Sequence, residues 1–445
     1  MSAVLHRDLN HRPRIATKGD GIALIDHDGR RYLDASGGAA VSCLGHSHPA
    51  VVAAVQAQVA SLPYAHSGFF TSEAAEALAE HLIARAPEGF GAGRAAFVGS
   101  GSEAMEVALK LTRQYFVEAG QPSRTRFIAR RMSYHGNTLG ALAIGGHMGR
   151  RAIYAPLLMA VSHISPCYPY RDRHDGEDPA AYCRRIADEL EAEIVRLGPH
   201  TVAAFVAEPV AGATLGSVPP PPGYFVRIRE ICDRYGVLFI ADEVMCGMGR
   251  TGTLFAMEGQ GACPDIVTVA KGLGAGYQPI AATLASGRIV ATIAAGSGML
   301  ANGHTYMGHP VACAAALAVL RTIEAEDLLA NVRARGEELR AALDQRFGQH
   351  PHVGDIRGVG LFQTLELVAD RGTKAPFSRS ARLAETVKQV AMDNGLICYP
   401  SAGVADGSEG DHVLLAPPYI VTSAEIAAIV DRLAASLDHA LLQAA

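Results

Sequence analysis

The sequence predicts an α/β protein that has a mostly parallel sheet in a large domain and a second, smaller α+β domain. In the middle of the chain, short runs rich in Val, Ile, Ala and Phe alternate with segments of helical periodicity. This alternation is typical of a largely parallel sheet covered by helices on both faces. From about Glu324 onward the pattern changes to longer, charged helical segments around a strand-like run. With 445 residues, 49% of them hydrophobic, the chain is long enough for two or three domains.

The first part of the chain predicts an irregular arm and a short sheet. Ala23–Asp26 and Arg31–Leu33 flank an Asp28-Gly29 turn, as expected of a hairpin. Helical periodicity follows over residues 49–60 and 72–86.

The remaining elements follow from periodicity and from apolar runs. We expect strands at 95–98, 126–129, 202–207, 237–241, 266–270, 280–285 and 360–367, and helices at 102–118, 224–235, 328–347, 381–394 and the C-terminus. We therefore expect residues 1–60 to form an arm and part of the small domain, residues 61–325 the large domain, and residues 326–445 the C-terminal small domain.

Composition and charge exclude several classes of protein. The net charge is −5 and no block of like charges occurs, which argues against nucleic acid and anionic membranes as partners. The 8 cysteines are scattered and form no CxxC pair, so we expect reduced structural thiols. No run approaches ~20 apolar residues, and the N-terminus has no apolar signal region. We therefore expect a cytoplasmic protein.

Two of the apolar runs end in ionisable residues. Asp242 and Glu243 follow the run at 237–241, where open α/β sheets bind ligands, although a helix cap or a surface turn is an alternative. Lys271 follows the run at 266–270, and glycines come directly after it. Burial lowers the pKa of a lysine, and a neutral amine attacks an aldehyde to form a Schiff base. A strand-end lysine that points to water is the alternative.

Two further segments suit a phosphate and a planar ring. Gly99–Ala104 follows a predicted strand and opens a helix, whose free N–H groups and positive dipole end suit a phosphate. No GKS or GKT follows, so this is not a P-loop. Tyr134, in the segment 132–136, stands after a strand, where an aromatic side chain can stack on a cofactor or simply belong to the core.

Together these segments resemble the class III (subgroup II) aminotransferases of pyridoxal-phosphate fold type I. The resemblance is closest to the ω-amino acid/amine:pyruvate branch and extends from about Gly21 to Ala440. The strings that carry it, in the order of the family, are SGSEAMEVALK, YHGNTLGALAI, FVAEPVAG, LFIADEVMCGMGRTG, PDIVTVAKGLGAGYQPIAA, NGHTYMGHPVACAAALAVL and DIRGVGLF.

The resemblance implies pyridoxal 5'-phosphate as cofactor and assigns three catalytic positions. It makes Lys271 the residue that binds the cofactor as a Schiff base and later moves a proton. It makes Asp242 the partner of the pyridinium nitrogen. It places Glu208 near the cofactor's hydroxyl side, and Tyr134 on the ring with His135 beside it.

The resemblance also implies the other contacts to the cofactor. Ser100, Gly101 and Ser102 correspond to the phosphate site, and Val244 to the residue on the opposite ring face. Thr305 corresponds to a residue that reaches the phosphate of the neighbouring subunit. The resemblance therefore implies a homodimer with a shared site, and a tetramer is an alternative.

Three positions depart from the family pattern and bear on the substrate. Members that use 2-oxoglutarate carry a glutamate and an arginine where this chain has Ala213 and Leu414. Loss of both charges together avoids a buried charge without a partner. Some members of the pyruvate branch carry a mobile arginine where this chain has Tyr399. Arg357 and Arg250 remain as binders of the substrate carboxylate, although their motifs suggest structural roles.

The predicted reaction is transfer of an amino group from an amine or ω-amino acid to a keto acid, with pyruvate as the expected acceptor. Alternatives are an aminomutase, a decarboxylase, a 2-oxoglutarate-using aminotransferase or a non-catalytic binding module. A polar insertion at 403–411 lies near the expected entrance. His46-Ser47-His48 lacks a third ligand, so we expect no metal site.

Overall fold

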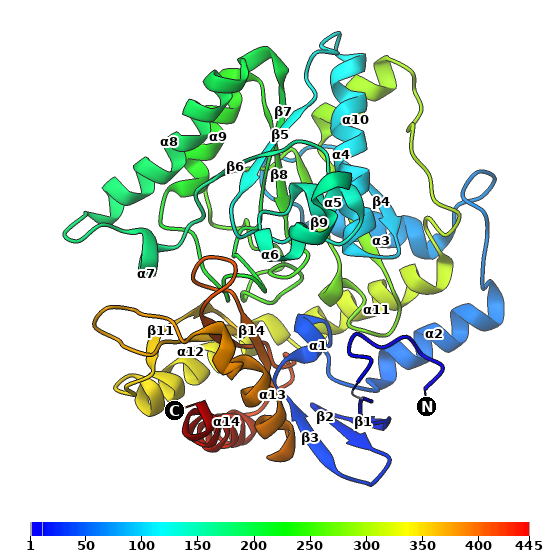
Figure 1. Ribbon diagram of the computed structural model, residues 1–445. Coiled ribbons are helices and arrows are strands. Elements are labelled where there is room, and N and C mark those ends of the chain that lie inside the picture. Colours follow the sequence, from blue (N-terminus) through cyan, green and yellow to red (C-terminus); the bar gives the residue numbers. More distant parts are fainter. Residues whose placement is uncertain (1, 11, 445) are drawn as a thin grey trace.

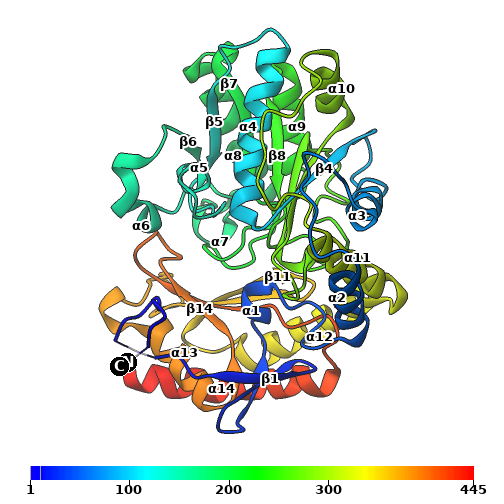
Figure 2. The ribbon, with the colours of Figure 1, turned by 90° about the vertical axis from the view of Figure 1, so that its right-hand side faces the viewer.

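The computed structural model describes residues 2–10 and 12–444. The molecule has a larger part built on a seven-stranded sheet and a smaller part that holds two four-stranded sheets (Figures 1 and 2). This arrangement confirms the α/β class that the sequence predicts.

The central sheet is mostly parallel. Its strands, in spatial order, are β4 (Arg94–Val98), β10 (Ala281–Ala285), β9 (Ile266–Val269), β8 (Leu238–Asp242), β7 (Val202–Ala207), β5 (Arg126–Arg130) and β6 (Ser162–Ile164). Only β10 is antiparallel to its neighbours; the other six strands point the same way. The carboxyl ends of β4, β5, β7, β8 and β9 therefore meet at one edge of the sheet.

Side chains on the two faces of this sheet belong to two different cores. On β7 and β8, Phe205 and Phe239 pack into one core, whereas Ala204 and Leu238 pack into the other. Helices of the first core are α3 (Glu73–Ile83), α8 (Pro179–Leu197), α9 (Tyr224–Tyr235) and α11 (Pro310–Ala325). Helices of the second are α4 (Gly101–Glu118), α5 (Leu139–Ile144) and α10 (Gly287–Ala295). Strands apolar on both faces follow from this double cover.

The smaller part combines both ends of the chain. One of its sheets has the order β1 (Ala16–Asp20), β2 (Ala23–Asp26), β3 (Arg31–Asp34) and β13 (Leu396–Ile397). The other has the order β11 (Val353–Val359), β12 (Phe362–Leu367), β15 (Asp411–Leu415) and β14 (Tyr399–Ala402). Its helices are α12 (Leu328–Phe347), α13 (Leu383–Asp393) and α14 (Ser423–Ala444), and α2 (Pro49–Ser61) packs against α11.

Most predicted elements are present, and several further ones are not predicted. The predicted hairpin is confirmed, because β2 and β3 pair antiparallel. The predicted polar insertion is a loop at 403–410 between β14 and β15, but its last residue, Asp411, is a buried strand residue. The unpredicted elements include α8, β1, β6, β11 and β13. Among the described helices, none is both long enough and apolar enough to cross a membrane.

Candidate active site

A cavity of about 490 Å³ opens where the carboxyl ends of the parallel strands meet. Its volume is in the range of small-molecule and cofactor sites. Nine of the ten site residues predicted from the sequence line it, and only Thr305 does not; the nine are Ser100, Gly101, Ser102, Tyr134, His135, Glu208, Asp242, Val244 and Lys271. The cavity therefore gathers residues that follow five different strands.

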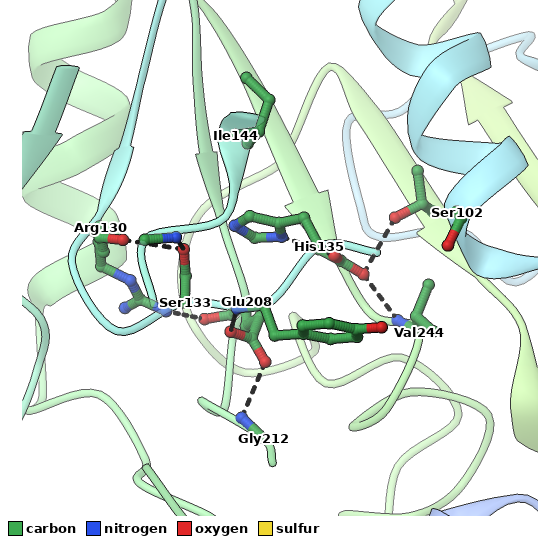
Figure 3. Close-up of polar contacts among 12 residues, drawn as sticks. Ser102, Arg130, Ser133, His135, Ile144, Glu208, Gly212 and Val244 are labelled. Atoms are coloured by element: carbon green, nitrogen blue, oxygen red, sulfur yellow. Dashed lines mark hydrogen bonds and ion pairs between the residues drawn. The ribbon is translucent and has the colours of Figure 1, made fainter. Parts of the chain in front are cut away.

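Asp242 is a buried carboxylate at the end of β8. Its Oδ2 lies 2.7 Å from Nδ1 of His135. Its Oδ1 accepts hydrogen bonds from the amide of Val244, at 3.1 Å, and from the hydroxyl of Thr268, at 3.2 Å. Figure 3 shows His135, Glu208 and Val244 close together in the site. These contacts hold the carboxylate in one orientation at the cavity.

Lys271 follows β9 and opens the short 3-10 helix η3 (Lys271–Leu273). Its Nζ donates a hydrogen bond of 3.0 Å to the carbonyl oxygen of Ala39. Burial lowers the pKa of the Lys271 amine to about 8, although Asp242 and Glu208 act to raise it. The φ angle of Lys271 is +44°, an uncommon value for a residue with a side chain and one that recurs at functional sites.

The acceptor for this amine belongs to a left-handed turn. The four residues of α1 (Gly37–Ala40) have φ angles from 56° to 65°. A Cβ on Gly37 would lie 2.5 Å from the carbonyl oxygen of Ala416, so this turn is fixed against the smaller part of the molecule.

Glu208 is a second buried carboxylate, directly after β7. It accepts hydrogen bonds from the amides of Tyr134, at 3.1 Å, and Gly212, at 2.8 Å. Burial raises its pKa, whereas the nearby His135 acts to lower it. Arg130 donates to the backbone carbonyl of Glu208, as Figure 3 shows. Glu208 thus ties the segment that carries Tyr134 to the end of β7.

The N-terminus of α4 forms a small polar cradle beside these acids. Ser100 caps the helix by accepting a hydrogen bond from the amide of Glu103, and Glu103 accepts one from the amide of Gly99. Ser102 Oγ accepts a hydrogen bond of 2.9 Å from the amide of Asn137. Free N–H groups at a helix N-terminus favour an anion.

Two glycines keep this cradle open. A Cβ on Gly101 would lie 2.8 Å from a methyl carbon of Val244, and a Cβ on Gly136 would lie 2.6 Å from Ser102 Oγ. The φ angle of Gly136, 132°, is also unfavourable for other residues. Glycine is therefore required at both positions.

Thr305 lies outside the main cavity. It is exposed and lines a neighbouring cavity, which shares Gly99 and the segment 278–280 with the main one. Its carbonyl accepts a hydrogen bond of 2.8 Å from the Tyr64 hydroxyl. The predicted role of Thr305 belongs to a neighbouring subunit, and the structure describes a single chain.

The positions that depart from the family pattern form an apolar wall. Ala213 and Leu414 share one buried apolar cluster, against which Tyr399 packs, and Ala213 also lines the cavity. The Arg357 guanidinium forms ion pairs within the protein, with Asp355 at 2.8 Å and Glu366 at 2.6 Å.

Arg250 is fully buried. Its Nη1 donates hydrogen bonds to the carbonyls of Leu361, at 3.0 Å, and Pro417, at 2.6 Å. Neither Arg250 nor Arg357 lines the cavity. The two arginines that sequence analysis offered as carboxylate binders thus have structural contacts.

Sequence analysis missed several residues around the cavity. The carbonyl of Ala39 and the hydroxyl of Thr268 belong to no polar motif. Arg150, in α6 (Met148–Arg151), stacks on the Tyr134 ring with 4.7 Å from its guanidinium carbon to the ring centroid. Gln278 lines the cavity, and its signal was present in the string GYQPIAA.

The two histidines of the HSH segment each have a carboxylate neighbour. His46 Nε2 lies 3.5 Å from Asp34, and His48 Nε2 lies 3.1 Å from Glu326. In the described part of the chain, no group of three or more His, Cys, Asp or Glu side chains is arranged to hold a metal ion.

Comparison with known proteins assigns this architecture to one family. Residues 4–437 match the family described as aminotransferase class III. An uncharacterized aminotransferase of Schizosaccharomyces pombe is 44% identical over 429 residues, which cover 96% of this chain and 93% of the relative. A diaminobutyrate–2-oxoglutarate transaminase of Halomonas elongata is 35% identical over 94% of this chain and 89% of the relative.

A solved structure shares the fold over almost the whole chain. The omega transaminase of Pseudomonas jessenii in complex with PMP superimposes with a TM-score of 0.90 at 36% identity. The match covers 97% of this chain and 93% of that structure.

Proposed function

This chain belongs to the class III aminotransferase family and is a pyridoxal-phosphate-dependent aminotransferase, and from this premise we propose that it transfers an amino group from an amine or ω-amino acid to pyruvate. The observation that carries the proposal is a lysine amine and a buried carboxylate in one cavity beside a helix N-terminus. Lys271, Asp242 and Glu208 are the proposed catalytic residues.

The lining of the cavity fits the cofactor of the family. The open N-terminus of α4 suits a phosphate, because its glycines leave room and its N–H groups favour an anion. Asp242 suits a protonated ring nitrogen, because it is buried and ionisable. His135 Nε2 is buried with no protein partner. We propose that Ser100, Gly101 and Ser102 hold the phosphate.

The chain's own residues would orient the cofactor and move protons. When bound, pyridoxal 5'-phosphate supplies an aldehyde for the amino group and a ring that withdraws electrons from the reacting carbon. Lys271 would hold the cofactor through Nζ and, when free, would take the proton from the donor carbon that bears the amino group and deliver it to the carbon that was the cofactor's aldehyde. Tyr134 and Val244 would bound the two faces of the ring, and Glu208 would lie on its hydroxyl side. The lowered pKa of Lys271 favours both of its tasks, since each needs a neutral amine.

The apolar wall supports pyruvate as the acceptor. A second carboxylate, as in 2-oxoglutarate, would lie near Ala213, which packs with Leu414 in one apolar cluster and offers no counter-charge. Burial of an unpaired carboxylate costs several kcal/mol, on the order of a hundredfold or more in binding. The name of the Halomonas elongata relative specifies 2-oxoglutarate, so 2-oxoglutarate is the second candidate.

We also propose a homodimer in which Thr305 completes the site of a second copy. Thr305 is exposed, and Tyr306 beside it is 68% exposed despite its aromatic ring. Exposed aromatic surface of this kind is common at interfaces between subunits.

A half-reaction panel tests the proposal. The purified holoenzyme is mixed with single amines and amino acids, and the loss of the cofactor's visible absorbance is followed. Keto acids are then added one at a time, and pyruvate is expected to restore the absorbance faster than 2-oxoglutarate. Lys271→Ala should lose turnover by several orders of magnitude, whereas Lys388→Ala, on the exposed face of α13, should retain it. Near-normal transamination by Lys271→Ala would overturn the proposed mechanism.

A further inference from the structure

Arg150 differs from the other arginines around the cavity because its guanidinium has no hydrogen bond or ion pair with the described part of the chain. It is half-buried, and its contact is the stacking on the Tyr134 ring at 4.7 Å. Tyr134 itself lines the cavity. The Tyr134 side chain therefore contacts both the cavity and the unpaired guanidinium of Arg150.

The other arginines in this region are buried or bonded to the protein. Arg357 pairs with two carboxylates, and Arg130 donates to the backbone carbonyl of Glu208. Arg250 donates through Nη1 to backbone carbonyls, and although its Nε and Nη2 have no partner, it is fully buried and does not line the cavity. Arg151, the neighbour of Arg150, donates to the carbonyls of Ala143 and Gly145. Among these arginines, Arg150 combines a half-exposed side chain with a guanidinium that makes no hydrogen bond or ion pair to the described part of the chain.

The charge of Arg150 acts on the cavity. Burial is the main cause that lowers the pKa of Lys271, and the positive charges of Arg250 and then Arg150 lower it further. The same charge contributes to the lowered pKa of His412, which burial and Arg357 lower more strongly. Arg150 therefore lies within electrostatic range of the amine at which the reaction is proposed to occur.

The loop at 403–410 of the smaller part braces the segment that carries Arg150. A Cβ on Gly149 would lie 2.9 Å from the carbonyl oxygen of Gly407, and a Cβ on Gly403 would lie 3.3 Å from His147 Nε2. The backbone of the loop therefore lies close to the backbone of Gly149, the residue before Arg150, while the Arg150 guanidinium stacks on the Tyr134 ring. The loop thus holds the segment that carries Arg150.

We propose that Arg150 binds the carboxylate of the amino donor, which makes ω-amino acids the preferred donors. The proposal rests on the proposed function and specifies its donor. Because Arg150 contacts Tyr134, which lines the cavity, and does not itself line the cavity, it suits a carboxylate that is separated from the amino carbon by several bonds. Guanidinium groups match carboxylates in a two-pronged geometry, and stacking on a ring leaves their N–H edges free.

The test compares two donors that differ only in the carboxylate. The donors are 4-aminobutyrate and n-butylamine, and the readout is the donor concentration that gives half-maximal loss of the holoenzyme's visible absorbance. Arg150→Gln should raise this concentration about 10- to 100-fold for 4-aminobutyrate, the usual range for loss of a charged hydrogen bond, and leave n-butylamine unchanged. Arg150→Lys should fall between the two.

Butanoate provides a measurement that needs no turnover. It should compete with n-butylamine in the wild-type protein, and its inhibition constant should rise in Arg150→Gln by the same factor. Arg340→Gln is the matched control, because Arg340 pairs with Asp344 on the exposed side of α12, within the smaller part.

The outcomes separate the two proposals. If the wild-type holoenzyme responds to neither donor, the proposed function fails and the role of Arg150 falls with it. If it responds, but Arg150→Gln changes both donors equally or neither, only the role of Arg150 is overturned.

Discussion

The amine of Lys271 should titrate far below an ordinary lysine, and this can be measured in the cofactor-free protein. Burial lowers its pKa from the usual 10.5 to about 8, against the opposing charges of Asp242 and Glu208. At pH 7 roughly one tenth of such an amine is neutral, compared with about one in three thousand for a lysine of pKa 10.5. The neutral fraction at pH 7 should therefore be about 300-fold higher, and the pH dependence of acylation measures it.

The assay is limited acylation with isotopically labelled acetic anhydride between pH 6 and pH 10, followed by digestion and mass spectrometry. Lys18, on the exposed strand β1, serves as the reference amine in the same digest. The labelling rate of Lys271 should rise with pH and level off above pH 8 to 9. Asp242→Asn should move this profile to lower pH, because it removes the largest influence that raises the pKa of Lys271.

Two results would refute the reasoning. One is a Lys271 profile that continues to rise up to pH 10, as for an exposed lysine. The other is an Asp242→Asn profile that moves to higher pH, which would show that the carboxylate does not act on this amine as the geometry requires.

Three further predictions concern Asp242, the polar cradle at the N-terminus of α4 and the apolar wall. Asp242→Asn should weaken cofactor binding and turnover by about a hundredfold or more, because a buried charge loses its partner; absorbance titration with the cofactor measures this. Gly136→Ala should weaken cofactor binding about tenfold, since its Cβ would lie 2.6 Å from Ser102 Oγ at a φ of 132°. Leu414→Arg should lower the free energy of unfolding by about 3–5 kcal/mol, and addition of Ala213→Glu should restore part of it in denaturant unfolding.

Each of these has a matched control. Asp233→Asn removes an acid that is 61% exposed, and should leave cofactor binding unchanged. Gly120→Ala places a Cβ in open space at a φ of 71°. If Gly120→Ala and Gly136→Ala lost cofactor affinity equally, the proposed role of the cradle in binding the phosphate would be contradicted. Leu414→Met preserves the packing volume, and a loss of stability as large as that of the arginine variant would show that charge is not the cause.

Much of the fold was predictable because its strands are buried on both faces and its helices are amphipathic. The bounds of β7 and α12 are those that the sequence predicts. The helix α8 was missed, although Asp178 caps it and Pro179 occupies its first turn. The pairing of β13 with β3 was not predictable, because a two-residue strand carries no periodicity and its partner is more than 360 residues away.

The site was predictable to the extent that it depends on strand ends. The chain direction of β5, β7, β8 and β9 places Tyr134, Glu208, Asp242 and Lys271 at one edge, so motif and topology agree. Arg150 was not predictable, because its position depends on a ring and on a loop from the other part of the molecule. The hydrogen bond from Lys271 to Ala39 depends on a left-handed turn that small residues permit but do not specify.

The left-handed turn of α1 links the state of the Lys271 amine to the N-terminal part of the chain. Two alanines, Ala39 and Ala40, adopt a left-handed conformation that costs roughly 1–2 kcal/mol each, and the lysine amine satisfies the carbonyl of the first. Once that amine is engaged elsewhere, the carbonyl loses its donor and the strained turn loses one of its restraints. Amide exchange over residues 35–43 therefore reports whether the Lys271 amine is engaged by a ligand.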